Sequence, residues 1–338
     1  MGLGSILDHL RRKPVPEKGD DKTNADATKK LEGGEAGEVS AGIKFYFLYL
    51  RKDKAAFVGL VLIAMFLGWS RIEGILQEVS AYTRNSHWSL MLIPSNPNGL
   101  FFNNKLLPPS LNSFPNNLFG TNYLGQSILA RMMYAAPHDA LASILVVGSA
   151  ILIGMILGTT AGYFGGWLDE FLMRLTDAFL SLPGIVLAIA IATLIGGGFT
   201  SLLYALMVVW WPTYARFFRG QALSLRDKAY VEASKLSGAG SGRILIRHIF
   251  PNSIDPIVAY ATLDLGTVIL TYSVLAFLGI GLTIGYPEWG AESSLGLPYF
   301  PYQWWPAIIP GVIIATVVIA FTLVGDRMQD LIVGRMTY

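Results

Sequence analysis

The sequence predicts an all-α integral membrane protein with six transmembrane helices. Hydrophobic residues make up 53% of its 338 residues, and only 14% are Asp, Glu, Lys or Arg, where about 25% is usual in soluble domains. Six apolar runs come close to the roughly 20 residues that a helix needs to cross a bilayer. Lys and Arg gather between only some of these runs, as they do in the loops on one side of a membrane. This composition disfavours a soluble enzyme and a chain that is disordered throughout.

The expected spans follow from the lengths of the apolar runs rather than from their periodicity. They cover residues 55–76, 137–163, 172–196, 200–218, 256–281 and 306–325. Charged residues precede the third run, so we expect its apolar part to begin near Ala178. Pro183 and Pro212 are expected to kink helices or to start them.

Lys and Arg also predict the orientation of the spans. They precede the first span at Lys44, Arg51, Lys52 and Lys54, and they fill the loop between spans four and five at Arg219, Arg226, Lys228, Lys235, Arg243 and Arg247. The loop 282–305 contains neither residue type. Because cytoplasmic loops collect Lys and Arg, we expect residues 219–255 and both termini to be cytoplasmic and 282–305 to be external.

The expected organisation has five parts. Residues 1–42 are charged and rich in Gly, which predicts a disordered cytoplasmic tail. The other parts are an N-terminal segment with the first span at 43–76, an external loop at 77–136, a five-helix core at 137–330 that contains the loop 219–255, and a cytoplasmic tail at 331–338. Asn and Pro are frequent in the external loop, and they favour turns over regular elements.

The loop 219–255 is expected to form two amphipathic, basic helices under the membrane. Good helix formers run from Arg216 to Lys235 and are followed by closely spaced glycines. A second short helix over 241–249 is expected to stop before Pro251. Short helices held between two membrane helices suit contact with a soluble partner. The simpler alternative is a loop that lies on anionic lipid.

Residues in this loop resemble the EAA motif of ABC-importer permeases, which reads E-A-A-x3-G and is followed by a segment ending in L-P. The matching positions are Glu232, Ala233, Ser234, Gly238 and the segment His248-Ile249-Phe250-Pro251, with Ser234 in place of Ala and Phe250 in place of Leu. Further blocks at 119–136, 162–183, Ser273–Gly281, Trp289-Gly290 and Gly325-Asp326 resemble the dipeptide/oligopeptide permease subfamily, and within it the C-type permease subunit. The likeness covers residues 45–330.

The resemblance implies a type I ABC-importer permease fold with a cytoplasmic coupling helix, in the cytoplasmic membrane of a prokaryote. It implies a homologous second permease, two ABC ATPase subunits, an external substrate-binding protein and membrane lipid as partners, and no nucleic acid. The chain is then not an enzyme and holds no cofactor, since the ATPase subunits bind ATP and Mg. The residues implied in coupling to the ATPases are Tyr230, Glu232, Ala233, Ser234, Gly238, His248 and Pro251.

The same resemblance implies a di- or oligopeptide as the cargo, with oligosaccharides or nickel as alternatives. The sequence departs from the family at Asn122, Gln126 and Ser127, where Asp, Arg and Asp are usual, and at Tyr272, where Glu is common. Candidates for the pathway or its gate are Asp264, Tyr272 and Pro183. An isolated charge in a bilayer is costly, so Asp264 is expected to face the pathway or the second permease, or to snorkel to the cytoplasmic surface.

Two other functions remain open at this point, a stand-alone secondary transporter and a purely structural subunit. The chain shows no inverted repeats with broken midplane helices, which disfavours the first. Residues 236–240 resemble the signature of an ABC ATPase, but the chain has no phosphate-binding loop, so they mark no nucleotide site. The absence of Cys excludes thiolate sites. Glu288 and Glu292 lie in a Gly- and Pro-rich loop and are not interpreted as a glycosidase pair.

Overall fold

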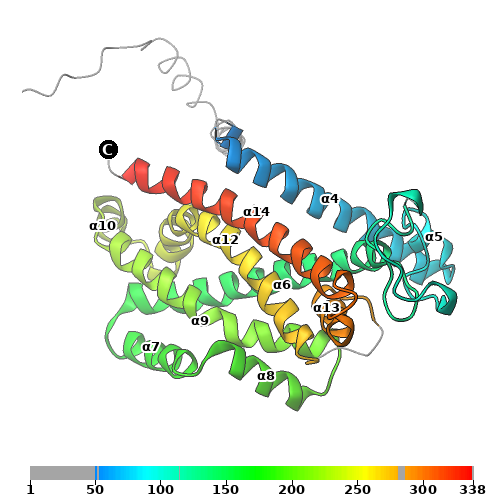
Figure 1. Cartoon of the computed structure of the whole chain (residues 1–338). Helices are drawn as coiled ribbons and strands as arrows, with labels where there is room; N and C mark the ends of the chain where they lie inside the picture. The colour runs from blue at the N-terminus through cyan, green and yellow to red at the C-terminus, as the bar shows by residue number, and fades with distance from the viewer. Residues whose placement is uncertain (1–49, 52, 114, 281–285, 337–338) are drawn as a thin grey trace, which may run out of the picture. The chain divides into compact units, whose positions relative to one another are not determined.

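Helices form almost all of the regular structure in the computed structural model, which describes residues 50–51, 53–113, 115–280 and 286–336 (Figure 1). Within these ranges there is no β-strand, only an isolated bridge between Thr121 and Ser127. The all-α prediction is therefore confirmed. The expected tail at 1–42 lies outside the described residues. Residues from Asp53 onward belong to one unit by their contacts, and it is the unit described below.

The main helices follow one another along the chain with short connections, apart from the segment that joins α5 to α6. They are α4 (Lys54–Thr83), α5 (His87–Leu90), α6 (Ile128–Phe164), α7 (Gly166–Leu180), α8 (Gly184–Ile195), α9 (Phe199–Arg226), α10 (Ala229–Leu236), α11 (Ser241–Ile244), α12 (Phe250–Phe277), α13 (Trp289–Gly296) and α14 (Trp305–Met336). A π-helical turn, Leu245–Ile249, joins α11 to α12. Figure 1 shows α4, α14 and α12 together at one side of α6 and α9.

Four helical segments of the described residues are long and apolar enough to cross a membrane: α4, α6, Pro256–Phe277 within α12, and Trp305–Leu331 within α14. The pair α7 and α8 passes the same test only together, which gives up to five spans. The expected span at 172–196 corresponds to this pair, whose helices meet at an angle of 85°, so that its crossing of the membrane stays a prediction. Pro183 precedes α8, where its fixed φ suits the start of a helix.

Helix α9 corresponds to the expected span at 200–218. It has 28 residues, which give a length of about 42 Å at 1.5 Å per residue. Its apolar character is interrupted by Trp210, Trp211 and Pro212, and the helix is not among the segments that pass the test. Its crossing of the membrane therefore stays a prediction.

Helix boundaries differ from the expected ones because helices continue beyond the apolar run. Helix α4 extends to Thr83, and α6 already begins at Ile128, where Ser127 caps it by accepting from the N–H of Ala130. The segment between α4 and α6 is thus shorter than the expected loop at 77–136. At the other end, α14 continues to Met336, into the region expected to be a tail at 331–338.

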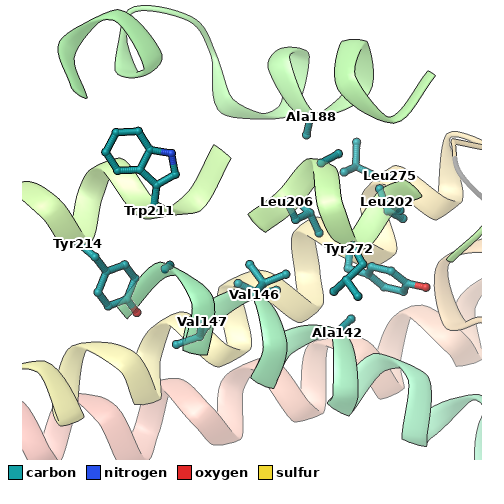
Figure 2. Packing of buried hydrophobic residues seen from close by; sticks show 14 of the residues in the cluster. Ala142, Val146, Val147, Ala188, Leu202, Leu206, Trp211, Tyr214, Tyr272 and Leu275 are labelled. Atoms are coloured by element: carbon teal, nitrogen blue, oxygen red, sulfur yellow. The ribbon is translucent and has the colours of Figure 1, made fainter. Parts of the chain in front are cut away.

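The core lies where α6 packs against α9. Gly154, Gly158 and Gly162 follow one another at four-residue spacing on α6, and all three face the backbone of α9. A Cβ atom on Gly158 would lie 2.2 Å from the carbonyl oxygen of Ala215. Small residues at this spacing let two membrane helices approach closely. Around this contact Val146, Val147, Leu202, Leu206, Tyr214, Tyr272 and Leu275 form a buried apolar cluster (Figure 2).

Candidate functional site

The short-helix element, defined as Ala229–Ile249, connects α9 to α12 and contains most of the predicted coupling residues. Its first helix is shorter than expected, because α9 ends at Arg226 and Lys228 adopts an extended conformation before α10. The expected stop before Pro251 is wrong, since the helical path continues from α11 through the π-helical turn into α12. Pro251 lies in the first turn of α12.

An apolar cluster holds the short-helix element against the rest of the chain. Val231, Ile244 and Ile249 are at most 1% exposed, and they pack with Ala222 of α9. Tyr163 of α6 packs on the same cluster and also lies 5.5 Å below the ammonium group of Lys235. The short-helix element is therefore packed against the ends of α6 and α9.

Gly238 makes the turn that ends α10. Its φ angle is +81°, in the left-handed region that favours glycine. Its N–H donates to the carbonyl oxygen of Lys235, and the N–H of Ala239 donates to that of Ser234, both at 3.0 Å. A Cβ atom on Gly238 would meet no atom within 4 Å. The requirement for glycine here is therefore one of backbone conformation and not of space.

His248 joins the two halves of the element. Its Nε2 atom shares a hydrogen bond of 2.9 Å with the hydroxyl of Ser234. Its ring lies 6.0 Å from the ring of Tyr230, centre to centre. The departure from the family motif at Ser234 thus supplies a hydrogen bond that Ala could not make. Three predicted residues, Tyr230, Ser234 and His248, come together in this contact.

The outer face of the element exposes large apolar residues beside unpaired charges. Leu236 is 85% exposed, Ile246 68% and Tyr230 42%. Glu232 and Ala233 are exposed as well, and the Glu232 carboxylate has no hydrogen bond or ion pair with any residue that the structure describes. Apolar side chains with this exposure next to free charges are typical of a surface that contacts another protein.

Salt bridges tie α7 to the membrane-proximal end of α9. Arg219 makes two hydrogen bonds to the Asp169 carboxylate, at 2.5 and 2.7 Å, and Arg216 makes one to Asp177 at 2.6 Å. Arg219, one of the basic residues that predicted the orientation, therefore also has a partner within the chain. The interaction with Asp169 raises the pKa of Arg219, which keeps its guanidinium charged.

The three pathway candidates lie in different surroundings. Asp264 is 8% exposed, and its Oδ2 accepts from Trp210 at 2.6 Å and from Tyr214 at 2.9 Å, so it links α12 to α9. This contact excludes the snorkelling position as the resting place of the carboxylate. Tyr272 is 1% exposed and packs edge-on to Phe199, within the apolar cluster (Figure 2). Pro183 is exposed at the break between α7 and α8.

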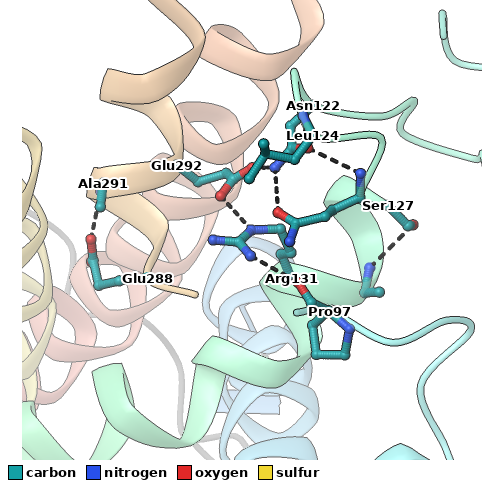
Figure 3. A network of polar contacts seen from close by, with 10 residues as sticks. Pro97, Asn122, Leu124, Ser127, Arg131, Glu288, Ala291 and Glu292 are labelled. Atoms are coloured by element: carbon teal, nitrogen blue, oxygen red, sulfur yellow. Dashed lines mark hydrogen bonds and ion pairs between the residues drawn. The ribbon is translucent and has the colours of Figure 1, made fainter. Parts of the chain in front are cut away.

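A second site, the external network, lies where the segment before α6 meets α13 (Figure 3). Arg131 and Glu292 form an ion pair of 2.5 Å, and each side chain is 1% exposed. Asn122 donates to Glu292 at 2.8 Å and to Gln126 at 2.9 Å. Arg131 also donates to the carbonyl oxygen of Pro97. Asn122 and Gln126, two positions that depart from the family, thus belong to one buried polar network.

Glu288 caps α13 beside this network, where its Oε2 accepts from the N–H of Ala291 at 2.6 Å. Burial, reinforced by the charge of Glu292, raises the pKa of Glu288 to about 7. Asp139 of α6 is fully buried and interacts with Glu288. No N–H or O–H of the described residues reaches the other oxygen of Glu288 or either oxygen of Asp139. The two buried carboxyl groups therefore have three oxygens that no donor of the described residues satisfies.

Sequence reasoning missed the partnership of Arg131 with Glu292 and the contact between Asp139 and Glu288. No local pattern could have revealed either, because each joins residues that are far apart in the chain. The close packing of α6 against another helix could have been predicted from the sequence, because Gly154, Gly158 and Gly162 follow one another at four-residue spacing. Among the described residues, no group of His, Asp or Glu could hold a metal ion.

Comparison with known proteins gives matches over most of the chain. Residues 150–338 match the family described as binding-protein-dependent transport system inner membrane component. The chain is 34% identical to the dipeptide transport system permease protein DppC of Alkalihalophilus pseudofirmus, over 86% of this chain and 89% of that protein. It is 36% identical to the probable D,D-dipeptide transport system permease protein DdpC of Escherichia coli, over 72% and 81%.

A similar solved structure supports the fold. A chain of the MetNI methionine ABC transporter in inward-facing conformations matches 60% of this chain and 95% of its own length. The TM-score is 0.50 and the sequence identity is 19%. At this identity the likeness concerns the arrangement of helices alone.

Proposed function

Because the chain belongs to the family of binding-protein-dependent transport system inner membrane components, we propose that it forms half of the pathway for di- or oligopeptides in an ATP-driven importer. The family is the membrane permease component of ABC transporters, a non-catalytic part of the complex. With its apolar helices, the chain is a multi-pass protein of the cell membrane. We place both termini and the short-helix element on the cytoplasmic side, because Lys and Arg collect there.

The proposal of a peptide cargo is supported by the relatives. Two of them are named for dipeptide or D,D-dipeptide transport, and a third, from Pectobacterium atrosepticum, is a glutathione transport system permease that is 34% identical. Glutathione is itself a peptide, so the three names share one chemical class. Oligosaccharides and nickel remain the alternative cargoes, and elution of the cargo from the captured binding protein distinguishes them.

The proposal that the short-helix element couples the ATPase subunits to the membrane helices rests on the difference between its two faces. Its inner face is fixed to α6 and α9 by Val231, Ile244 and Ile249. Its outer face exposes Leu236 and the unpaired Glu232. An ATPase subunit that docks on the outer face can therefore move α6 and α9 as it binds and hydrolyses ATP. Because glycines bring α6 and α9 into direct backbone contact, the two helices would move together.

The complete importer would contain this chain, a homologous second permease, two ATPase subunits that bind ATP and Mg, and an external substrate-binding protein. The external network and residues 84–127 lie on the side where the binding protein would dock. We keep Pro183 as a gate candidate, because it lies at a sharp bend between two apolar helices. Asp264 and Tyr272 would support the pathway wall from within the chain, given their burial.

Affinity purification from gently solubilised membranes tests this proposal. We expect a tagged chain to co-purify with a second permease and with ATPases that carry a phosphate-binding loop. Peptides eluted from the captured binding protein would identify the cargo, whereas eluted oligosaccharide or nickel would favour an alternative. A chain that purifies alone and transports in liposomes without ATPase partners would contradict the importer and indicate a secondary transporter.

A further inference from the structure

A cavity of about 350 Å³ lies between α4 and the first half of α6, away from both sites described above. Its lining is apolar at one end, with Leu67, Leu141 and Ile144. Ser70, Arg71 and Glu78 supply its polar groups, and Gly74, Ile75, Pro137 and Ala140 complete the lining. The cavity therefore combines an apolar floor with two opposite charges and a hydroxyl group.

The depth of these residues follows from the geometry of α4. Arg71 lies 17 residues after Lys54, which places it about 25 Å along the helix. The apolar core of a bilayer is about 30 Å thick. In the orientation proposed above, Arg71 therefore lies near the outer boundary of this core. This placement rests on that proposed orientation. Glu78 lies two turns further out, at the level of the headgroups, and Leu67 lies one turn deeper.

The polar groups of the cavity have no partners in the chain. Arg71 and Glu78 are exposed, and neither forms an ion pair or a side-chain hydrogen bond with any residue described by the structure. The hydroxyl of Ser70 is buried and also unpartnered. A guanidinium group at the boundary of the hydrocarbon lies at the level where phosphate groups of lipids can meet it. The cavity thus offers a cation and a hydroxyl donor to an anion at Arg71 and Ser70, and a carboxylate to a cation at Glu78.

The order of Arg71 and Glu78 along the membrane normal indicates which ligand fits the cavity. A phospholipid presents its acyl chains to the membrane interior, then its phosphate, and then the substituent of the headgroup. We propose that the cavity binds phosphatidylethanolamine, with the phosphate on Arg71 and Ser70 and the ammonium group on Glu78. An acyl chain would lie over Leu67, Leu141 and Ile144. Ethanolamine fits better than choline because its N–H groups donate hydrogen bonds to a carboxylate. Phosphatidylglycerol offers no cation for Glu78.

The site differs from general contact with the bilayer because it requires both charges in a fixed order. Seven residues separate Arg71 from Glu78, which places them on the same face of α4, two turns apart. Exchange of the two charges would keep the net charge and the cavity but would reverse the order. Such a variant should therefore not bind phosphatidylethanolamine, although it still offers one cation and one anion.

The test measures lipid that is retained by the purified importer. The complex is reconstituted in nanodiscs with equal parts of phosphatidylethanolamine, phosphatidylcholine and phosphatidylglycerol, is extracted with mild detergent, and its bound lipid is counted by native mass spectrometry. We expect phosphatidylethanolamine to be enriched on the wild-type complex. Arg71→Gln, Glu78→Gln and the exchange Arg71→Glu with Glu78→Arg should each lower its retention about tenfold, as loss of one charged hydrogen bond implies.

Arg174→Gln is the matched control, because Arg174 is an exposed arginine on another membrane-associated helix and pairs only with its neighbour Glu170. It should leave the retained lipid unchanged. The proposal would be overturned if the Arg71→Gln complex retained as much phosphatidylethanolamine as the control complex. Enrichment of phosphatidylglycerol on the wild-type complex would also overturn it, and so would coverage of the cavity by the second permease. Peptide uptake by the wild-type complex is measured in parallel. A failed lipid site with normal uptake leaves the proposed function intact.

Discussion

Arg131 and Glu292 are separated by 161 positions in the sequence and form an ion pair of 2.5 Å that is almost completely excluded from solvent. The pair joins the first turn of α6 to α13, and Asn122 adds a hydrogen bond to the same carboxylate. This contact fixes the beginning of α6 to α13. Because the ion pair is buried, the loss of either Arg131 or Glu292 should lower the stability of the protein.

Glu292→Ala should lower the stability of the protein by about 3–5 kcal/mol, because it removes the carboxylate that neutralises the buried charge of Arg131. The double variant Arg131→Leu with Glu292→Leu should lose less than the single variant, since no charge is left buried. The apparent melting temperature of the purified complex measures both effects. Glu170→Ala, which removes an exposed pair with Arg174, should cost about 0–1 kcal/mol. A double variant less stable than Glu292→Ala would contradict this explanation.

Gly238→Val should reduce transport much more than Gly240→Val. Gly238 has a φ angle of +81°, whereas Gly240 has one of −66°, and neither position is restricted by neighbouring atoms. A residue with a Cβ atom costs about 1–2 kcal/mol in the left-handed region. Gly238→Asn should be tolerated better than Gly238→Val, because Asn adopts this region more readily. Uptake normalised to the amount inserted in the membrane measures the difference, and equal uptake by both Val variants would refute the role of this turn.

Leu236→Asp should weaken the association of the ATPase subunits without unfolding the chain. Leu236 is 85% exposed on the outer face of the short-helix element, so its replacement disturbs no packing within the chain. Co-purification of ATPase subunits with the tagged chain measures the effect. Leu111→Asp provides the control, since Leu111 is also strongly exposed but lies in the segment between α5 and α6. Undiminished recovery of the ATPases with Leu236→Asp would place their docking surface elsewhere.

Gly158→Ala should destabilise the contact between α6 and α9 by about 1–3 kcal/mol, as overpacking does. The new Cβ atom would lie 2.2 Å from the carbonyl oxygen of Ala215, so the two backbones would have to separate. Gly148→Ala on the same helix meets no atom within 4 Å and should be neutral or slightly stabilising. Comparison of the two melting temperatures tests this, and a neutral Gly158→Ala would show that α6 and α9 are less tightly packed.

The contribution of Glu288 to stability should fall as the pH rises. Burial raises the pKa of Glu288 to about 7 from an ordinary value of 4.5, so the folded protein binds its proton more tightly than the unfolded chain does. The contribution is therefore complete below pH 4.5 and is lost between pH 4.5 and about 7. Glu288→Gln should weaken this dependence, because the amide does not titrate but can still accept from Ala291 and donate to Asp139.

The apparent melting temperature between pH 4.5 and 8 measures the contribution of Glu288. Glu170→Gln, an exposed acid with an ordinary partner, should keep the wild-type profile. A profile for Glu288→Gln that equals the wild type would show that another group is responsible.

Run length and charge placement predicted the helical class and the positions of the main spans, since both depend on local composition. The turn at Gly238 was also predictable, because glycine spacing is a local property, whereas the break before α10 was not, because good helix formers continue across it. Pro183 indicated the break between α7 and α8, but not its angle of 85°, because apolar composition does not report direction. The inward position of Asp264 depends on Trp210 and Tyr214 of another helix, and no pattern within α12 contains that information.

Uptake by reconstituted proteoliposomes tests the central claim most directly. The chain is reconstituted with its co-purified permease and ATPases, the binding protein is added outside with a labelled dipeptide, and ATP is supplied at the face of the short-helix element. The account predicts uptake that requires ATP and every subunit, and that is lost in Leu236→Asp together with ATPase binding. Dipeptide uptake by the chain alone, driven by an ion gradient and insensitive to Leu236→Asp, would contradict it.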